Sequence, residues 1–267
     1  MDKSPATIRV ACLGGAYIQP GAQRFLALLN EHPEVDLVAV LCQGAGGRWI
    51  DRWADLFRRR GLLAPLVLLM EGLSLAAEWL RSPIGMMRLH RAWAEVRRKV
   101  EWFPDLHAPR AISRLKGFSP DLAVIYGGPL VKQEVYSLPR LGTLGIHHGR
   151  VPAYRGKKTT FWEMYYGESH AGITIQQVGA GIDTGDVVGA SEVAIGARSY
   201  GSVWREVERV GCELFLQAVL EAHRGTLTRR PQEGLMQKGK VFRQPTPWQL
   251  LTLRSHRRQI LQQKAGQ

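Results

Sequence analysis

The chain has 267 residues, of which 45% are hydrophobic and 22% are charged, a balance typical of a soluble globular protein with one large domain and at most a modest appendage. Its 36 Lys and Arg outnumber its 23 Asp and Glu, and the formal net charge of +13 favours anionic partners. Three widely separated cysteines, Cys12, Cys42 and Cys212, exclude a disulfide framework and a cysteine-based metal site, and no metal is predicted.

The N-terminal residues lack the long apolar segment of a signal peptide, so we expect a cytoplasmic protein. After them, the spacing of apolar residues predicts a strand over 8–13, a helix over 20–29 and a buried strand over 35–42. Strand, helix and strand with short links favour a parallel strand pair with a right-handed crossover. The Gly14–Gly15 turn lacks the spacing of a dinucleotide-binding fingerprint, and no dinucleotide site is predicted.

Residues 48–108 interrupt this alternation with a stretch that favours helices and is rich in Arg, Leu and Trp. Its most apolar part contains Glu71 and Glu78, so it lacks the long uncharged run of a transmembrane helix. Two interpretations stay open. The stretch forms a helical lid or dimer surface on the core, or residues 48–103 form an amphipathic element that contacts the cytoplasmic face of a membrane through Trp and Arg side chains.

The alternation of strands and helices resumes after residue 108 and continues towards the C-terminus. Hydrophobic periodicity predicts strands over 122–126, 173–178 and 187–195, a short strand ending at His147 and a short edge strand over 241–243. It predicts helices over 110–116, around Trp162 and over 200–224, and a basic helix from residue 248. Trp162 lies at helical spacing with Tyr165 and Tyr166, which indicates core packing rather than a substrate platform.

Positive charge is concentrated in residues 224–267, where ten Lys and Arg accompany a single acid, Glu233. Such a field attracts anions of several kinds, namely RNA, the diphosphate of a nucleotide sugar, or acidic lipid headgroups. A basic tail that only improves solubility is the alternative.

Residues 145–186 carry the strongest functional signal in the chain. His147 ends a short apolar run, and the Gly-rich turn after the predicted strand over 173–178 contains Asp183 and Asp186. An imidazole can donate or accept a proton near neutral pH, and a carboxylate beside it orients the ring. His147 and Asp183 are therefore a candidate acid–base pair.

The same stretch resembles the signature of the folate-dependent formyltransferases, a family that includes methionyl-tRNA, glycinamide ribonucleotide and sugar N-formyltransferases. That signature is Asn-x-His, then Pro-x-Tyr-Arg-Gly, a Trp, Gly-Glu, and a loop ending in Asp-Thr-Gly-Asp. The residues that match it in register are His147, Pro152, Tyr154, Arg155, Gly156, Trp162, Gly167, Glu168, Gly172, Thr174, Asp183, Thr184, Gly185 and Asp186. The resemblance covers residues 109–195 well and residues 1–45 loosely.

One position departs from the family pattern, because Gly145 stands where the family has a catalytic asparagine. In the family that amide helps to hold the negative charge that develops on the formyl oxygen, and removing one such donor typically costs about 100- to 1,000-fold in rate. His148, Lys157 or a backbone N–H could replace it. Otherwise the enzyme is slow, or the site binds a ligand without formyl transfer.

The resemblance implies an α/β fold with a mostly parallel Rossmann-like sheet of the formyltransferase type, a helical insertion at about 48–108 and a short basic C-terminal extension. It implies a catalytic domain over 1–198, followed by a C-terminal helix and basic extension over 199–267. By the same resemblance, His147 and Asp183 are catalytic and N10-formyltetrahydrofolate is the co-substrate.

The resemblance also implies binding residues. The implied folate contacts are Gly128, Pro129, Leu130, Val131, Val178, Gly179, Ala180, Gly181 and Ile182. Glycines at 179 and 181 would let backbone groups approach a flat heterocycle. The candidate contacts to the acceptor are His148, Tyr154, Arg155 and Lys157. Tyr154, Arg155 and Gly156 are also read as a structural corner.

The layout favours a sugar N-formyltransferase of surface-polysaccharide biosynthesis, whose acceptor is a small molecule, an amino sugar carried by an anionic nucleotide. Methionyl-tRNA formyltransferases add a C-terminal barrel, and the residues after 195 are too few and show little strand pattern. Glycinamide ribonucleotide formyltransferases have no counterpart of the insertion. A nucleic-acid partner is therefore not favoured, and a homodimer is a further expectation.

Three other functions stay open. The acceptor could be methionyl-tRNA. A formyltetrahydrofolate hydrolase would use the same His147 and Asp183 with water in place of the amine. A catalytically inactive protein that binds anions or membranes would use the basic tail and the insertion, with Gly145 leaving the chemistry absent.

Overall fold

The computed structural model describes residues 7–15, 18–44, 82–232 and 240–265, and the single residues 57, 61, 65, 69 and 80. The chain divides into two compact units, Met1–Arg140 and Leu141–Gln267. Residues 199–267 thus belong to the same unit as residues 141–198, and a domain boundary after residue 198 stays a prediction.

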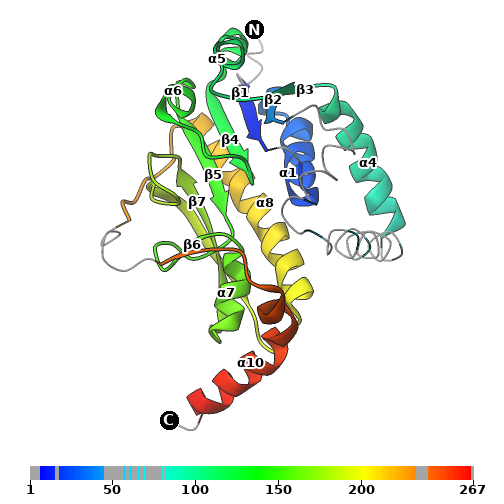
Figure 1. Cartoon of the computed structure of the whole chain (residues 1–267). Coiled ribbons are helices and arrows are strands. Elements are labelled where there is room, and N and C mark those ends of the chain that lie inside the picture. Colours follow the sequence, from blue (N-terminus) through cyan, green and yellow to red (C-terminus); the bar gives the residue numbers. More distant parts are fainter. Residues whose placement is uncertain are drawn as a thin grey trace. The chain divides into compact units, whose positions relative to one another are not determined.

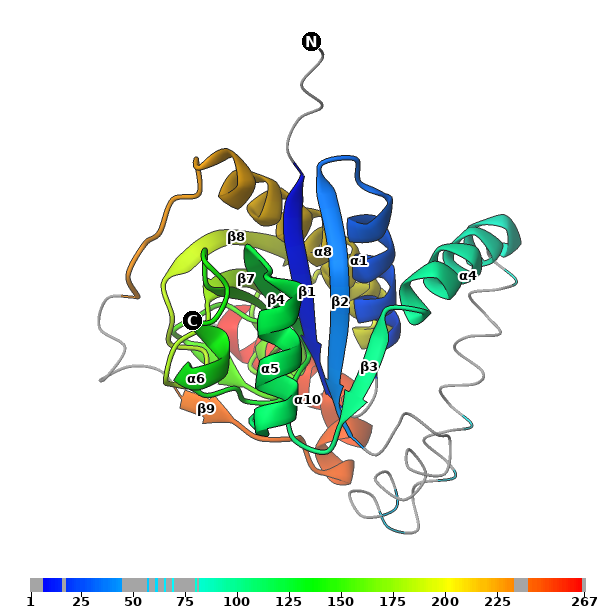
Figure 2. The ribbon, with the colours of Figure 1, turned by 90° about the horizontal axis from the view of Figure 1, so that it is seen from above.

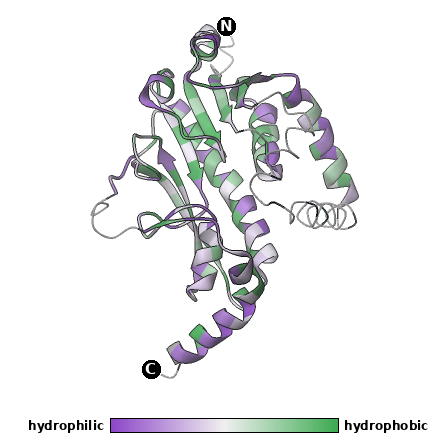
Figure 3. Ribbon diagram, in the orientation of Figure 1, coloured by the Kyte–Doolittle hydropathy of each residue, from purple (hydrophilic) through white to green (hydrophobic). Residues whose placement is uncertain are grey.

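Among the described residues of the first unit, four strands pair in parallel in the order β3-β2-β1-β4 (Figure 1, Figure 2). Their bounds are β1 Ile8–Gly14, β2 Val35–Gln43, β3 Val100–Phe103 and β4 Leu122–Tyr126. Figure 3 shows β1 and β4 as mostly hydrophobic, as expected for strands of a parallel sheet that is covered on both faces. The strands predicted over 8–13, 35–42 and 122–126 are confirmed.

Three of the described helices of the first unit begin with a proline. Proline fits the first turn because its missing N–H would have no partner there in any case. The helices with such a proline are α1 Pro20–Glu31, α4 Pro83–Arg97 and α5 Pro109–Phe118, and the short α6 spans Gln133–Tyr136. α1 lies beside α4 (Figure 1). The helices predicted over 20–29 and 110–116 are confirmed.

The predicted insertion over 48–108 is helical only in part. α4 confirms a helix within it, but Val100–Phe103 is a strand, and the helical prediction is wrong there. This short strand pairs with β2 and so satisfies backbone groups along that edge. Most of residues 48–81, on which the lid, dimer and membrane interpretations largely rest, lie outside the described residues. No helix in the described part of the chain is long and apolar enough to cross a membrane.

In the second unit, β5, β7 and β8 pair antiparallel in that order. Their bounds are β5 Thr143–His147, β7 His170–Gln177 and β8 Val187–Ala194. The predicted α/β fold with a mostly parallel sheet is confirmed, although β7 pairs antiparallel with both β5 and β8. For β7 and β8 the cause is the connection, because they are joined by the turn over 178–186 and not by a crossover helix. A separate parallel pair joins β6 Tyr154–Gly156 to β9 Lys240–Phe242.

The helices of the second unit are α7 Thr159–Tyr165, α8 Tyr200–Arg224 and α10 Pro247–Ala265. At the start of α8, the Ser199 hydroxyl oxygen accepts the N–H of Ser202. Gly225 ends α8 in the left-handed conformation, with φ of +69°. The predicted helix over 200–224, the short strand near 241–243 and the basic C-terminal helix are confirmed, and Figure 3 shows α10 as mostly hydrophilic.

Trp162 is part of the core, as its spacing predicted. It packs with Tyr154, Phe161 and Phe242, and its indole N–H donates to the carbonyl oxygen of Arg243 at 2.9 Å. The three cysteines are buried and free.

Candidate active site

The paired strands β5 and β7 separate an apolar face from a polar one. Side chains alternate along a strand, so Ile146 lies on one face while Gly145 and His147 lie on the other. Ile146 and Ile173 pack with buried residues of α8. His147 stands opposite Thr174 in the strand register, on the face away from α8. The alternation of the sequence therefore presents the histidine on the polar face.

His147, the last residue of β5, is held at both ring nitrogens. Its side chain is only 7% exposed. Its Nε2 lies 2.7 Å from the carbonyl oxygen of Tyr154, and because a carbonyl oxygen can only accept, Nε2 carries the hydrogen of this bond. Its Nδ1 lies 3.4 Å from Oδ2 of Asp183. The two residues that the sequence predicted as an acid–base pair therefore meet.

Asp183 lies in the turn between β7 and β8 with φ of +51°, a left-handed conformation that is uncommon for residues other than glycine. Its Oδ2 accepts the backbone N–H of Gly156 at 2.8 Å, and its Oδ1 accepts a side-chain N–H of Gln176 at 2.9 Å. These bonds fix the carboxylate in place. Its side chain is 19% exposed, so Asp183 is the more accessible member of the pair.

Hydrogen bonding limits where the protons of this pair can lie. Because Nε2 of His147 is a donor, a neutral ring has a lone pair at Nδ1, which would face an oxygen of an ionised Asp183. The contact is attractive when one further proton lies on Nδ1 or on the carboxyl group. The arrangement can therefore hold a proton between a ring nitrogen and a carboxyl oxygen and pass it to a neighbouring atom.

The turn over 178–186 leaves an open stretch of backbone. Gly185 must be glycine, because a Cβ there would overlap the carbonyl oxygen of Gln177. A Cβ at Gly179, in contrast, would meet nothing within 4 Å, and Ile182 is 42% exposed. Within the predicted folate contacts from Val178 to Ile182, Ala180, Gly181 and Ile182 are thus exposed, and the backbone at Gly179 borders open space.

The other predicted folate contact, the loop Gly128–Val131, follows β4 in the first unit. Its first glycine has a packing reason, because a Cβ on Gly128 would lie 2.7 Å from the carbonyl oxygen of Leu13. Pro129 is half-buried, whereas Leu130 is 71% exposed. Leu130 is therefore the side chain of this loop that is most available to a ligand.

His148, one of the predicted acceptor contacts, lies on the α8 side of the strand. Its ring centroid is 4.9 Å from that of Trp204. Burial, and then the nearby charges of His147 and Lys158, lower the pKa of His148 to about 3, so the ring is neutral at physiological pH. His148 thus lies on the face opposite to the one at which the side chain of residue 145 would project.

The other predicted acceptor contacts differ in exposure. Tyr154 is buried, stacks on Phe242 and donates its hydroxyl hydrogen to Glu168 at 2.8 Å. Arg155 is half-buried, and Lys157 is exposed. Tyr154 therefore serves the fold through its side chain and the candidate site through its carbonyl oxygen, which holds His147.

Glu163 is a buried carboxylate that sequence reasoning missed. It lies on α7 with no exposed surface and accepts the backbone N–H groups of Arg150 and Gly172 at 3.0 Å and 3.1 Å. Burial raises the pKa of Glu163 to about 8, although these N–H donors and the Arg150 guanidinium favour the charged form. An acid within the otherwise apolar Phe161–Met164 segment was the available signal.

Two further polar residues, Gln176 and Gln232, adjoin the pair and were also missed. Gln176 could have been found, because strand alternation places it on the same face as Thr174. Gln232 follows α8 in a segment without periodicity, and no sequence signal pointed to it.

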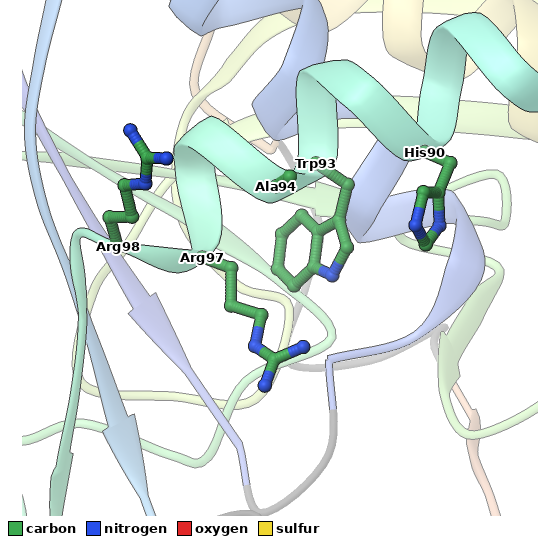
Figure 4. A pocket seen from close by; sticks show the side chains of 5 residues that line it. All are labelled: His90, Trp93, Ala94, Arg97 and Arg98. Carbon is green, nitrogen blue, oxygen red and sulfur yellow. The ribbon is translucent and has the colours of Figure 1, made fainter.

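The remaining features of the described residues do not add to this site. Among those residues, no group of three or more His, Cys, Asp and Glu side chains is arranged to hold a metal ion. A hollow on the first unit is lined by α4 and the residue after it, with Trp93 beside Arg97 (Figure 4). None of the predicted site residues lines that hollow.

Residues 93–219 match the family described as Formyl transferase, and the matched segment contains both His147 and Asp183. The methionyl-tRNA formyltransferase of Syntrophus aciditrophicus is 34% identical over 134 residues, which are 49% of this chain and 42% of that protein. The chain thus spans less than half the length of this curated relative.

Solved structures share the fold at lower identity. HypX from Aquifex aeolicus, in complex with tetrahydrofolic acid, is 18% identical and matches 90% of this chain and 30% of its own chain with a TM-score of 0.57. A sugar N-formyltransferase from Shewanella sp FDAARGOS_354 is 12% identical and matches 88% of this chain and 76% of its own chain with a TM-score of 0.56. The predicted formyltransferase-type fold is confirmed.

Proposed function

We propose, because residues 93–219 match the family described as Formyl transferase, that this chain transfers a formyl group from N10-formyltetrahydrofolate to an amine. The observation that carries the proposal is the 3.4 Å contact between His147 and Asp183 within the matched segment. The open backbone at Val178–Ile182 supports a place for the folate beside that pair.

Formyl transfer needs proton movement at three atoms. The attacking amine loses a proton as the new C–N bond forms, the formyl oxygen gains negative charge, and the folate nitrogen takes up a proton as the old C–N bond breaks. Asp183, the more exposed partner, can accept the proton of the amine. A protonated His147 can stabilise the charge on oxygen and supply the proton to the leaving nitrogen, so the pair ends with as many protons as it began.

For the acceptor, we propose an amino sugar carried by a nucleotide. The exposed Lys157 beside β6 and the exposed Arg254 and Arg258 of α10 support an anionic small molecule. Methionyl-tRNA is the second candidate, favoured by the 34% identity to a methionyl-tRNA formyltransferase.

The test is a turnover assay that follows the folate product by absorbance. Its arms are N10-formyltetrahydrofolate with a panel of nucleotide-linked amino sugars, with methionyl-tRNA, and with no acceptor. Turnover only with an amino sugar supports the proposal, turnover only with methionyl-tRNA moves the acceptor to the second candidate, and formate release without an amine identifies a hydrolase. Absence of turnover in every arm contradicts formyl transfer and favours an inactive protein that binds anions or membranes.

The same assay tests the role of the histidine. We expect His147→Ala to lower kcat/KM by about 100- to 10,000-fold, because it removes a general acid–base group. The matched control is His170→Ala, since His170 is an exposed histidine at the start of β7. Equal activity of the two variants would remove His147 from the mechanism.

Two interactions predicted from the insertion belong to the same proposal. α4 exposes Ile84 and Met87 near basic residues, which supports peripheral contact of residues 48–103 with an anionic membrane on the cytoplasmic side. Co-sedimentation with anionic and neutral vesicles would test this contact, and sedimentation velocity would test the homodimer.

A further inference from the structure

Gln176 fills the position across the strand pair from Gly145. The register places these two residues directly opposite each other. Directly opposite residues of an antiparallel pair project from the same face, with Cβ atoms about 5 Å apart. Because Gly145 has no side chain, the carboxamide of Gln176 is the one that this pair presents on the face of His147, and it is buried there.

The carboxamide of Gln176 joins two groups in a chain of hydrogen bonds. Its Nε2 donates to Oδ1 of Asp183 at 2.9 Å, and its Oε1 accepts from Nε2 of Gln232 at 3.3 Å. The Gln232 nitrogen also donates to the carbonyl oxygens of Asp183 and Gly185, at 3.3 Å and 2.6 Å. Each amide nitrogen faces only acceptor oxygens, so the nitrogens must point as they do. Three of the four bonds end on the Asp183 turn, and the fourth joins Gln232 to Gln176.

From this arrangement we propose that Gln176 and Gln232 are positioning residues, which hold Asp183 so that its Oδ2 faces His147. The inference rests on the proposed formyl transfer. In the family pattern the carboxamide belongs to an asparagine at position 145, on β5. Here Gln176 supplies a carboxamide from the opposite position on β7.

The physical reason lies in the conformation of Asp183. A left-handed residue other than glycine persists only when its surroundings over-determine it. Gln232 bonds the backbone of the turn, Gln176 bonds Oδ1, and the N–H of Gly156 bonds Oδ2. Without the Gln176 amide, Oδ1 of Asp183 loses the side-chain donor that holds it, and the carboxylate can rotate away from Nδ1 of His147.

Gln176→Met tests this role, because methionine has a similar length and no amide. Losing a hydrogen bond to a charged group corresponds to a fall in kcat of about 10- to 100-fold. We expect this fall with the KM for folate and acceptor and the thermal midpoint close to those of the wild type. The matched control is Gln217→Met, since Gln217 is an exposed α8 residue bonded to Glu221.

Gln232→Met should lower kcat less than Gln176→Met does. In the double variant, the fall in kcat should be smaller than the product of the two single effects, because Gln232 acts partly through Gln176.

Rescue distinguishes positioning from simple packing. Gly145→Asn restores an amide from the opposite strand, so we expect it to recover part of the lost kcat in the Gln176→Met background and to add little to the wild type. If the wild type turns over and Gln176→Met keeps full kcat, the inference is wrong and the proposed function stands. If the wild type transfers no formyl group to any acceptor, the proposed function is wrong, and the positioning role needs a test that does not use activity.

Crystal structures of the wild type and of Gln176→Met provide that test. An unchanged distance between His147 and Asp183 overturns the positioning role, and a longer distance supports it.

Discussion

The two faces of the β5–β7 pair differ in what holds their side chains. On the α8 side, Ile146 and Ile173 lie among apolar neighbours, and a Cβ on Gly211 of α8 would lie 2.9 Å from Ile146 Cδ1, so helix and strand approach closely. On the other side, His147 and Gln176 are held by hydrogen bonds to Tyr154 and Asp183. Apolar packing depends little on the orientation of a side chain, whereas hydrogen bonds fix that orientation. The same two strands can therefore supply stability on one face and correctly oriented catalytic groups on the other. Substitutions should therefore separate the two properties.

The largest effect is expected on the polar face, from Asp183→Asn. The amide oxygen can still accept the N–H of Gly156, but the amide nitrogen then faces the Gln176 donor, and the side chain can no longer take up a proton. We expect kcat/KM to fall by about 100- to 10,000-fold, while a cooperative urea transition shows that the fold is retained. Turnover at the wild-type rate would show that Asp183 has no part in proton transfer.

On the apolar face, the expected effect is on stability. Ile173→Ala removes a buried side chain from the cluster under α8 and should lower the free energy of unfolding by about 2–5 kcal/mol. Well below the unfolding midpoint, kcat should remain that of the wild type. The control is Val241→Ala, an exposed apolar position on β9, for which we expect a change within about 0.5 kcal/mol in urea unfolding. A fall in kcat for Ile173→Ala without loss of stability would contradict the separation of the two faces.

Much of this arrangement could be predicted from the sequence, because it rests on local patterns. Apolar runs specify β1, β2 and β4, and helical periodicity with a serine cap and a terminal glycine specifies α8. His147 and Asp183 could be predicted as a pair because a motif spans both of their loops.

The rest depends on contacts between segments far apart in the sequence. β3 and β6 have four and three residues, too few to show a period, and each is defined by its partner strand. Gln232 reaches Gln176 across 56 positions, and such a bond leaves no local pattern. The antiparallel pairing of β7 with β8 follows from the turn over 178–186, whose glycines indicated a bend but not the direction of pairing. The antiparallel pairing of β5 with β7 spans a connection that contains β6 and α7, and no local pattern specified it.

The smallest effect is expected from Glu163, a titratable group with a structural rather than a chemical role. Burial raises the pKa of Glu163 from 4.5 to about 8 in the folded chain, so the folded state binds this proton more tightly than the unfolded state does. The contribution of Glu163 to stability is therefore greatest below pH 4.5. It falls as the pH rises towards 8, because the carboxyl group ionises first in the unfolded state.

Glu163→Gln keeps an acceptor for the N–H groups of Arg150 and Gly172 without the charge. Relative to the wild type, the variant should gain stability steadily between pH about 5 and about 8, with kcat at fixed pH unchanged. Urea unfolding across this range measures the gain, and Glu192→Gln, which removes an exposed partner of Arg150, is the control. Parallel loss of stability in variant and wild type would mean that Glu163 is already ionised in the folded chain, and that its two N–H donors outweigh its burial.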